Sequence, residues 1–131
     1  MSRGQALLEL AVCAPIVMLL TVGAVASAQV IDARAGLDAA TTEAAAAAAR
    51  APDPASADSA ARSRFQSMVA DYPLRSAHLT ISFGKFSRTD AVLATASANV
   101  DVSWAEFVIS RTLKLESRCT VAIEPWRSHR P

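Results

Sequence analysis

The sequence predicts an α+β protein, with one long N-terminal helix followed by a short helix and a small three-stranded antiparallel sheet. The first observation is a run without charged residues from Leu10 to Val30. The second is an alanine-rich stretch that extends the helical pattern to Arg50, and the third is an alternation of apolar and polar residues beyond Pro73. A chain of 131 residues has room for at most one domain beside the helix.

The uncharged run predicts a membrane-spanning segment at about residues 10–30 of a helix over residues 5–50. A helix needs about 20 apolar residues to cross a hydrocarbon core of about 30 Å. Pro15 lies inside the run and has no N–H to donate to the carbonyl of Ala11, so we expect a kink there.

A stripe of small and apolar residues continues along one face of this helix, at steps of three and four. Its members are Gly23, Ala26, Val30, Ala33, Leu37, Ala40, Ala44 and Ala47. Such a stripe fits assembly with other chains, and it fits equally well a helix that packs against the C-terminal part of its own chain.

Residues 51–56 read as a linker, because the residue before each proline of Pro52-Asp53-Pro54 is pushed away from the α region. A short helix follows, with Ser56 as its expected N-cap, and Pro73 stops it. Its apolar face would hold Ala61, Phe65, Met68, Val69 and Tyr72. It opens a small module that spans residues 57–131.

Three segments then alternate with a period of two, at residues 76–83, 91–104 and 112–124. They predict half-buried strands of an antiparallel meander with one solvated face. We expect the short helix to cover the other face. The apolar positions are Leu79, Ile81, Phe83, Ala94, Ala96, Ala98, Val100, Val102, Trp104, Leu113, Leu115, Cys119, Val121 and Ile123.

The connection between the second and third strands is unusually apolar, since connections are normally polar and exposed. It contains Trp104, Phe107, Val108 and Ile109. In one interpretation Trp104 and Phe107 close the bottom of the small core. In the other, Phe107, Val108 and Ile109 form an exposed tip that contacts a neighbouring subunit or the membrane surface.

Residue patterns of enzymes are missing from the sequence. We find no Ser/His/Asp or Cys/His pairing, no metal-ligand spacing and no glycine-rich phosphate loop. We therefore predict no catalytic residues, no cofactor, no metal and no small-molecule substrate. The net charge of +1 without a basic cluster argues against nucleic acid as a partner. The two cysteines, Cys13 and Cys119, are expected to be small buried apolar residues.

Glu9 directly precedes the apolar run, and a charged residue at this position needs a functional explanation. A carboxylate near the centre of a membrane segment costs about 2.5–3.5 kcal/mol, and less near its end. Gly4 precedes it by five residues, and this spacing resembles the type IV prepilin pattern. The resemblance implies that a membrane peptidase cuts between Gly4 and Gln5. Glu9 of one subunit would then pair with the new amine on Gln5 of a neighbour and set the axial register. The alternative is a glutamate that snorkels to the lipid headgroups.

Residues 3–51 resemble the start of the TadE-like family of the tight-adherence (Flp-type) pilus machinery. The matching positions are Arg3, Gly4, Ala6, Glu9, Leu10 and Pro15. The resemblance implies a minor pilin or pseudopilin with a leader at residues 1–4. Its partners would be a prepilin peptidase, other pilin or pseudopilin subunits and the pilus assembly platform. It also implies a single-pass protein of the bacterial cytoplasmic membrane, with its N-terminus in the cytoplasm and its C-terminal module outside.

A different processing route also fits the N-terminus. Ala26-Ser27-Ala28 is a suitable site for a signal peptidase, and Arg3 supplies a weak positive charge ahead of the apolar run. A cut after Ala28 would leave a membrane-free module that starts at Gln29. The chain would then be a secreted extracytoplasmic binding module, and without any cut it would be a membrane-anchored one.

Overall fold

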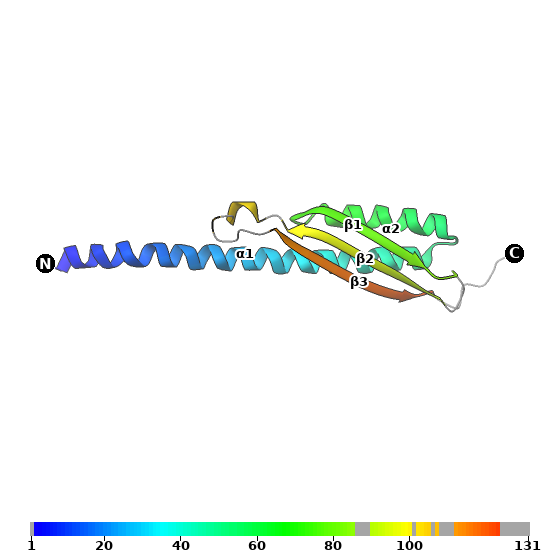
Figure 1. Cartoon of the computed structure of the whole chain (residues 1–131), viewed down its shortest axis with the longest axis horizontal. Helices are drawn as coiled ribbons and strands as arrows, with labels where there is room; N and C mark the ends of the chain where they lie inside the picture. The colour runs from blue at the N-terminus through cyan, green and yellow to red at the C-terminus, as the bar shows by residue number, and fades with distance from the viewer. Residues whose placement is uncertain (1, 86–89, 101, 106, 108–111, 124–131) are drawn as a thin grey trace.

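The computed structural model describes residues 2–85, 90–100, 102–105, 107 and 112–123. The elements in chain order are α1 (Ser2–Arg50), α2 (Pro54–Val69), β1 (Leu74–Phe83), β2 (Ala91–Val100), the single 3-10 turn η1 (Ser103–Ala105) and β3 (Leu113–Ala122). Figure 1 shows a helical layer and a sheet at one end of a long helix whose N-terminal part projects alone. The predicted α+β class is confirmed.

Helix α1 is continuous over 49 residues, which corresponds to about 73 Å at 1.5 Å per residue. It runs through Pro15 without a break, so the proline does not end the helix. The kink expected at Pro15 stays a prediction. The helix ends at Arg50, just before the two prolines that disfavour helical backbone.

Helix α2 starts earlier than the sequence suggested, because its N-cap is Asp53 and not Ser56. The Asp53 carboxylate accepts a hydrogen bond from the backbone N–H of Ser56 at 2.9 Å and another from the Ser56 hydroxyl at 2.8 Å. Pro54 takes the first helical position, where its missing N–H costs nothing. The connection to α1 is therefore only residues 51–53, not 51–56.

The sheet is an antiparallel meander in the order β1-β2-β3, as predicted. Its register places the apolar positions of all three strands on one face. Ala96 on the central strand lies opposite Leu79 on one side and Ser117 on the other, and the neighbouring rows follow the same pattern. Strand β1 carries a bulge between Arg75 and His78, where Ser76 has a φ of 51°.

The apolar face of the sheet is covered mainly by α1, which corrects the expectation that the short helix would cover it. Helix α1 packs against β2 and β3, while α2 packs against α1 and the edge strand β1. The core is rich in alanine on both sides of this contact, and small side chains let the helix and the sheet approach closely. The core residues are Ala33, Leu37, Ala40, Ala44, Ala45, Ala48, Ala49, Ala51, Ala57, Ala61, Phe65, Leu79, Val92, Ala94, Ala96, Ala98, Val100, Val102, Leu115 and Ile123.

The alanine stripe thus serves the chain's own fold over its C-terminal part. Ala33, Leu37 and Ala40 are fully buried, and Ala47 is half-buried. Beyond this stretch, toward the N-terminus, only Ala26 of the described α1 residues is buried. The projecting apolar segment and the folded module therefore share one helix and are not two units joined by a linker.

Candidate functional site

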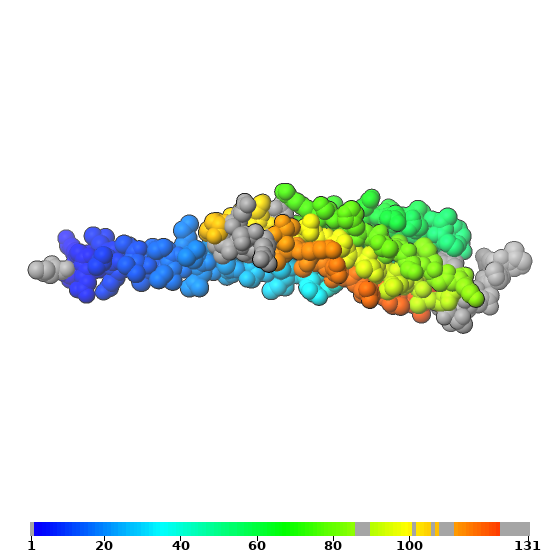
Figure 2. Space-filling model, in the orientation of Figure 1, coloured from blue at the N-terminus to red at the C-terminus, as the bar shows by residue number. Residues whose placement is uncertain are grey.

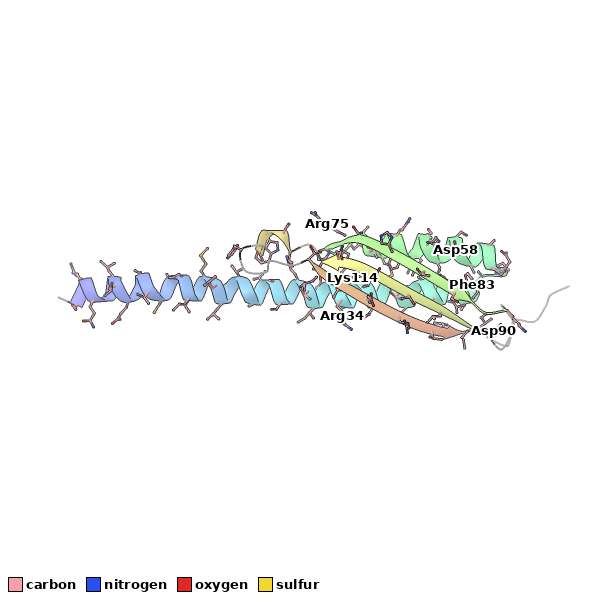
Figure 3. All side chains as sticks on the ribbon, in the orientation of Figure 1. Arg34, Asp58, Arg75, Phe83, Asp90 and Lys114 are labelled. Atoms are coloured by element: carbon pink, nitrogen blue, oxygen red, sulfur yellow. The ribbon has the colours of Figure 1, made fainter. Side chains whose placement is uncertain are left out.

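The N-terminal half of α1 has the exposure expected of a helix that lies in lipid or against partner subunits. Residues 2–21 are all exposed, and their side chains radiate to every side of the helix (Figure 3). By length and composition, α1 is a helix that could cross a membrane. Burial of apolar surface contributes about 25 cal/mol per Å², so this surface would be unfavourable in water.

Gly4 is exposed within α1, and a Cβ added there would meet nothing within 4 Å. Packing inside the chain therefore does not require a glycine at this position. Glycine in a helix interior costs about 1 kcal/mol relative to alanine. Helix propensity and packing among the described residues thus both leave Gly4 unexplained.

Glu9 lies one helical turn after Gln5, on the same side of α1. The Gln5 amide Nε2 is 3.5 Å from the Glu9 Oε1 atom, and both side chains are exposed. This distance is at the outer limit of a hydrogen bond. Glu9 makes no ion pair among the described residues, so within one chain its charge is satisfied only by this long contact.

The cysteines do not behave alike, which corrects the expectation that both would be buried. Cys13 is exposed on the projecting part of α1, and Cys119 on β3 is half-buried. Both are free thiols. Because the Cys13 thiol is exposed, its reactivity can be used to probe the environment of this part of α1.

Where the projecting part of α1 meets the folded module, a long-range contact joins α1 to η1. The Trp104 indole Nε1 donates a hydrogen bond to the Gln29 side-chain Oε1 at 2.8 Å. Sequence reasoning missed Gln29, because nothing local to it signals a partner 75 positions away. Trp104 itself was expected in the second strand and its core, yet β2 ends at Val100 and the Trp104 side chain is 43% exposed.

The apolar connection does not close the core at Phe107, whose side chain is 70% exposed. Val108 and Ile109, the other two residues of the expected tip, lie outside the described residues. Figure 2 shows the η1 region, in gold, against the side of α1 next to the sheet. Exposure of Phe107 is what an interaction surface requires, and it does not by itself say which partner it meets.

A close approach between α1 and the turn after α2 is the second feature that sequence reasoning missed. Gly36 is buried, and a Cβ added there would overlap the ring of Tyr72. Tyr72 was expected on the apolar face of the short helix, but it follows the end of α2 and lies against Gly36. The position of this glycine therefore fixes how the turn docks on α1.

The polar contacts of the module support structure. Arg62 pairs with Asp58 at 2.9 Å, which raises the pKa of Arg62, and its Nη1 reaches the Leu79 carbonyl at 3.3 Å, so α2 is tied to β1. The hydrogen bonds from Ser56 lower the pKa of the Asp53 cap. Among the residues that the structure describes, no three His, Cys, Asp or Glu side chains gather to hold a metal ion.

The comparisons with known proteins point to the same helix. The family model of TadE-like proteins matches residues 4–50. No curated protein and no solved structure gives a significant match to the chain. The matched residues coincide with α1 from Gly4 to its end and stop before α2. The similarity to TadE-like proteins therefore covers α1 and does not include α2 or the sheet.

Proposed function

We propose that this chain is a minor pilin or pseudopilin needed to assemble a Tad/Flp-type pilus, inserted in the cytoplasmic membrane through residues 10–30 of α1. The observation that carries the proposal is the TadE-like match over 4–50, which coincides with a helix whose first twenty residues have no cover within the chain. The N-terminus would lie in the cytoplasm and the sheet outside. In the family that this sequence resembles, the major Flp pilins are much shorter chains with almost no globular part. A C-terminal module of this size therefore favours a minor pilin or pseudopilin.

The proposed processing step is a cut between Gly4 and Gln5 by a prepilin peptidase. Gly4 has no packing role in the chain and lies five residues before Glu9, which fits recognition by an enzyme. The cut would create an α-amino group on Gln5. That amine would be the ion-pair partner that Glu9 lacks among the described residues of one chain.

Pairing with a neighbouring subunit would remove the cost of two charges in an apolar environment. An uncompensated buried charge is strongly unfavourable, whereas a paired one is tolerated. Each subunit would therefore settle at the height where its Glu9 reaches the Gln5 amine of the next. The partners in this proposal are the peptidase, other pilin or pseudopilin subunits, the assembly platform and the membrane.

Mass spectrometry of the mature N-terminus tests the processing step. With the system's own peptidase co-expressed, we expect the chain to begin at Gln5. Gly4→Val should leave the leader attached, because the added side chain blocks the peptidase. Gly23→Val is the matched control, since Gly23 is also a helix glycine with open space around it, and it should be processed normally. An intact wild-type N-terminus would contradict the proposal.

The same measurement separates the alternative function. A secreted binding module would begin at Gln29 after a cut behind Ala28, and a plain anchored module would begin at Met1 or Ser2. Neither alternative gives Glu9 a role. A mature chain that begins at Gln5 is therefore the result that favours the pilin-like route.

Glu9→Gln tests the pairing. The amide keeps the shape of the side chain and loses the charge, so insertion and processing should persist while co-purification with other pilins is lost. Asp32→Asn is the control, because Asp32 is the first charged residue after the apolar run and is exposed. If Glu9→Gln assembles as the wild type does, the glutamate only snorkels to the headgroups.

A further inference from the structure

The large apolar side chains that remain exposed fall into two groups. Most lie on α1 between Leu7 and Ile31, where a membrane or partner subunits would cover them. Among the other described residues, only Trp104 and Phe107 are large, apolar and exposed, at 43% and 70%. They are neighbours on and just after η1, away from the sheet core. A contact outside the chain would remove this surface from water.

The hydrogen bond between Trp104 and Gln29 fixes the height of this surface along α1. Gln29 is the penultimate residue of the uncharged run, and the first charged residue after it is Asp32. Twenty steps from Leu10 to Val30 span about 30 Å along a helix, which equals the thickness of the hydrocarbon core. Trp104 therefore sits at the level where the outer boundary of that core falls.

The residue types suit that level. Tryptophan is enriched where membrane meets water, because its ring is apolar and its N–H needs a polar partner. Here the N–H is satisfied by Gln29 and the rest of the ring is partly exposed. On α1, Val25 and Ile31 lie within about 6 Å of Gln29 along the helix axis and are exposed as well, at 47% and 69%.

We infer that Trp104 and Phe107 rest on the outer leaflet of the membrane, in the region between the headgroups and the acyl chains, and seat the module on the bilayer surface. The sequence left a neighbouring subunit and the membrane surface as possible partners of this stretch, and the Trp104–Gln29 contact favours the membrane. The inference rests on α1 spanning the membrane, as the proposed function requires. It does not rest on the peptidase cut or on pilus assembly.

Depth-dependent fluorescence quenching tests the inference in the full chain, reconstituted in vesicles of phosphatidylcholine and phosphatidylglycerol. Trp126→Phe leaves Trp104 as the only tryptophan. We expect its emission to be blue-shifted, and to be quenched more strongly by a nitroxide near the headgroup than by one at the end of the acyl chain. A second variant, Trp104→Phe with Trp126→Phe and Phe107→Trp, should show the same order of quenching.

The control variant combines Trp104→Phe and Trp126→Phe with Lys85→Trp. Lys85 is exposed and follows β1. Phe83, at the end of that strand, lies far from the projecting part of α1 (Figure 3). Tryptophan at position 85 should be unquenched by lipid labels. If Trp104 and tryptophan at position 107 behave like position 85, the membrane contact is refuted. If tryptophans at positions 104 and 107 are shielded from aqueous acrylamide only in assembled fibres, this surface contacts a neighbouring subunit and not the membrane.

Cys13 separates this inference from the proposed function. In the Cys119→Ser background, Cys13 should not react with a membrane-impermeant maleimide, because it lies inside the inserted segment. An unreactive Cys13 with an unquenched Trp104 refutes the surface contact and leaves the membrane anchor in place. A reactive Cys13 would show that α1 is not inserted, which overturns both.

Discussion

Replacing Gly36 by alanine sets two opposing effects against each other, and the structure says which one dominates. Alanine stabilises a helix interior by about 1 kcal/mol relative to glycine. The added Cβ, however, would overlap the Tyr72 ring, and overpacking of this kind typically costs about 1–3 kcal/mol. We expect a net loss of stability of up to about 2 kcal/mol in the wild-type background.

The sign should reverse when the ring is absent. In a Tyr72→Ala background the overlap is gone, so Gly36→Ala should stabilise the module by about 1 kcal/mol. The assay is urea unfolding of the full chain in detergent micelles, followed by near-UV circular dichroism. Ala35→Gly, at an exposed position one residue earlier, calibrates the helix-propensity contribution. If Gly36→Ala stabilises the chain equally with and without Tyr72, the close approach described here is wrong.

Three further predictions concern the module. A fragment of residues 29–131 should fold, whereas residues 51–131 should not, because the second lacks the α1 residues of the core; dispersion of NMR signals distinguishes them. Thr41→Val should change the free energy of unfolding by less than about 1 kcal/mol, since the buried hydroxyl only donates to a carbonyl of its own helix, and denaturant titration measures this. Asp53→Ala should lower the melting temperature at neutral pH. Folding lowers the pKa of Asp53 below its ordinary 3.8. The stabilisation from the ionised Asp53 cap is therefore present above pH 3.8 and is lost as the pH falls through the lower folded pKa. Equal melting temperatures of variant and wild type at neutral pH would refute the cap.

The strands could be predicted because their pattern has a single interpretation. An alternation with period two puts all its apolar members on one face, and the register confirms this for Leu79, Ala96 and Leu115. The start of α2 was predicted wrongly at Ser56, since Asp53 and Ser56 are both good N-caps three positions apart. The structure uses Asp53 as the cap and Ser56 as its donor.

The role of α1 in the core could not be decided from the sequence, because an alanine-rich helix has several equally apolar faces. The prediction that Trp104 lies in the second strand and its core was also wrong. A tryptophan that continues an alternating pattern is expected in the core. The indole N–H of Trp104 instead donates a hydrogen bond to Gln29, which is distant in the sequence. The roles of Gly4 and Glu9 were predicted from their spacing alone and stay predictions. The structure adds that a Cβ at Gly4 would meet nothing within 4 Å and that Glu9 has only a long contact with Gln5.

The uninterrupted course of α1 has a mechanical consequence. A protein with a flexible linker could hold its sheet at any angle to its N-terminal helix, but here the projecting apolar segment and part of the module's core belong to one helix. Each residue along an α-helix turns by about 100° and rises by 1.5 Å. If subunits pair through Glu9, a slip of one residue would swing the sheet through about a quarter of a circle around the fibre axis while barely changing its height. Axial register near the N-terminus would therefore set the azimuth of the module at the fibre surface.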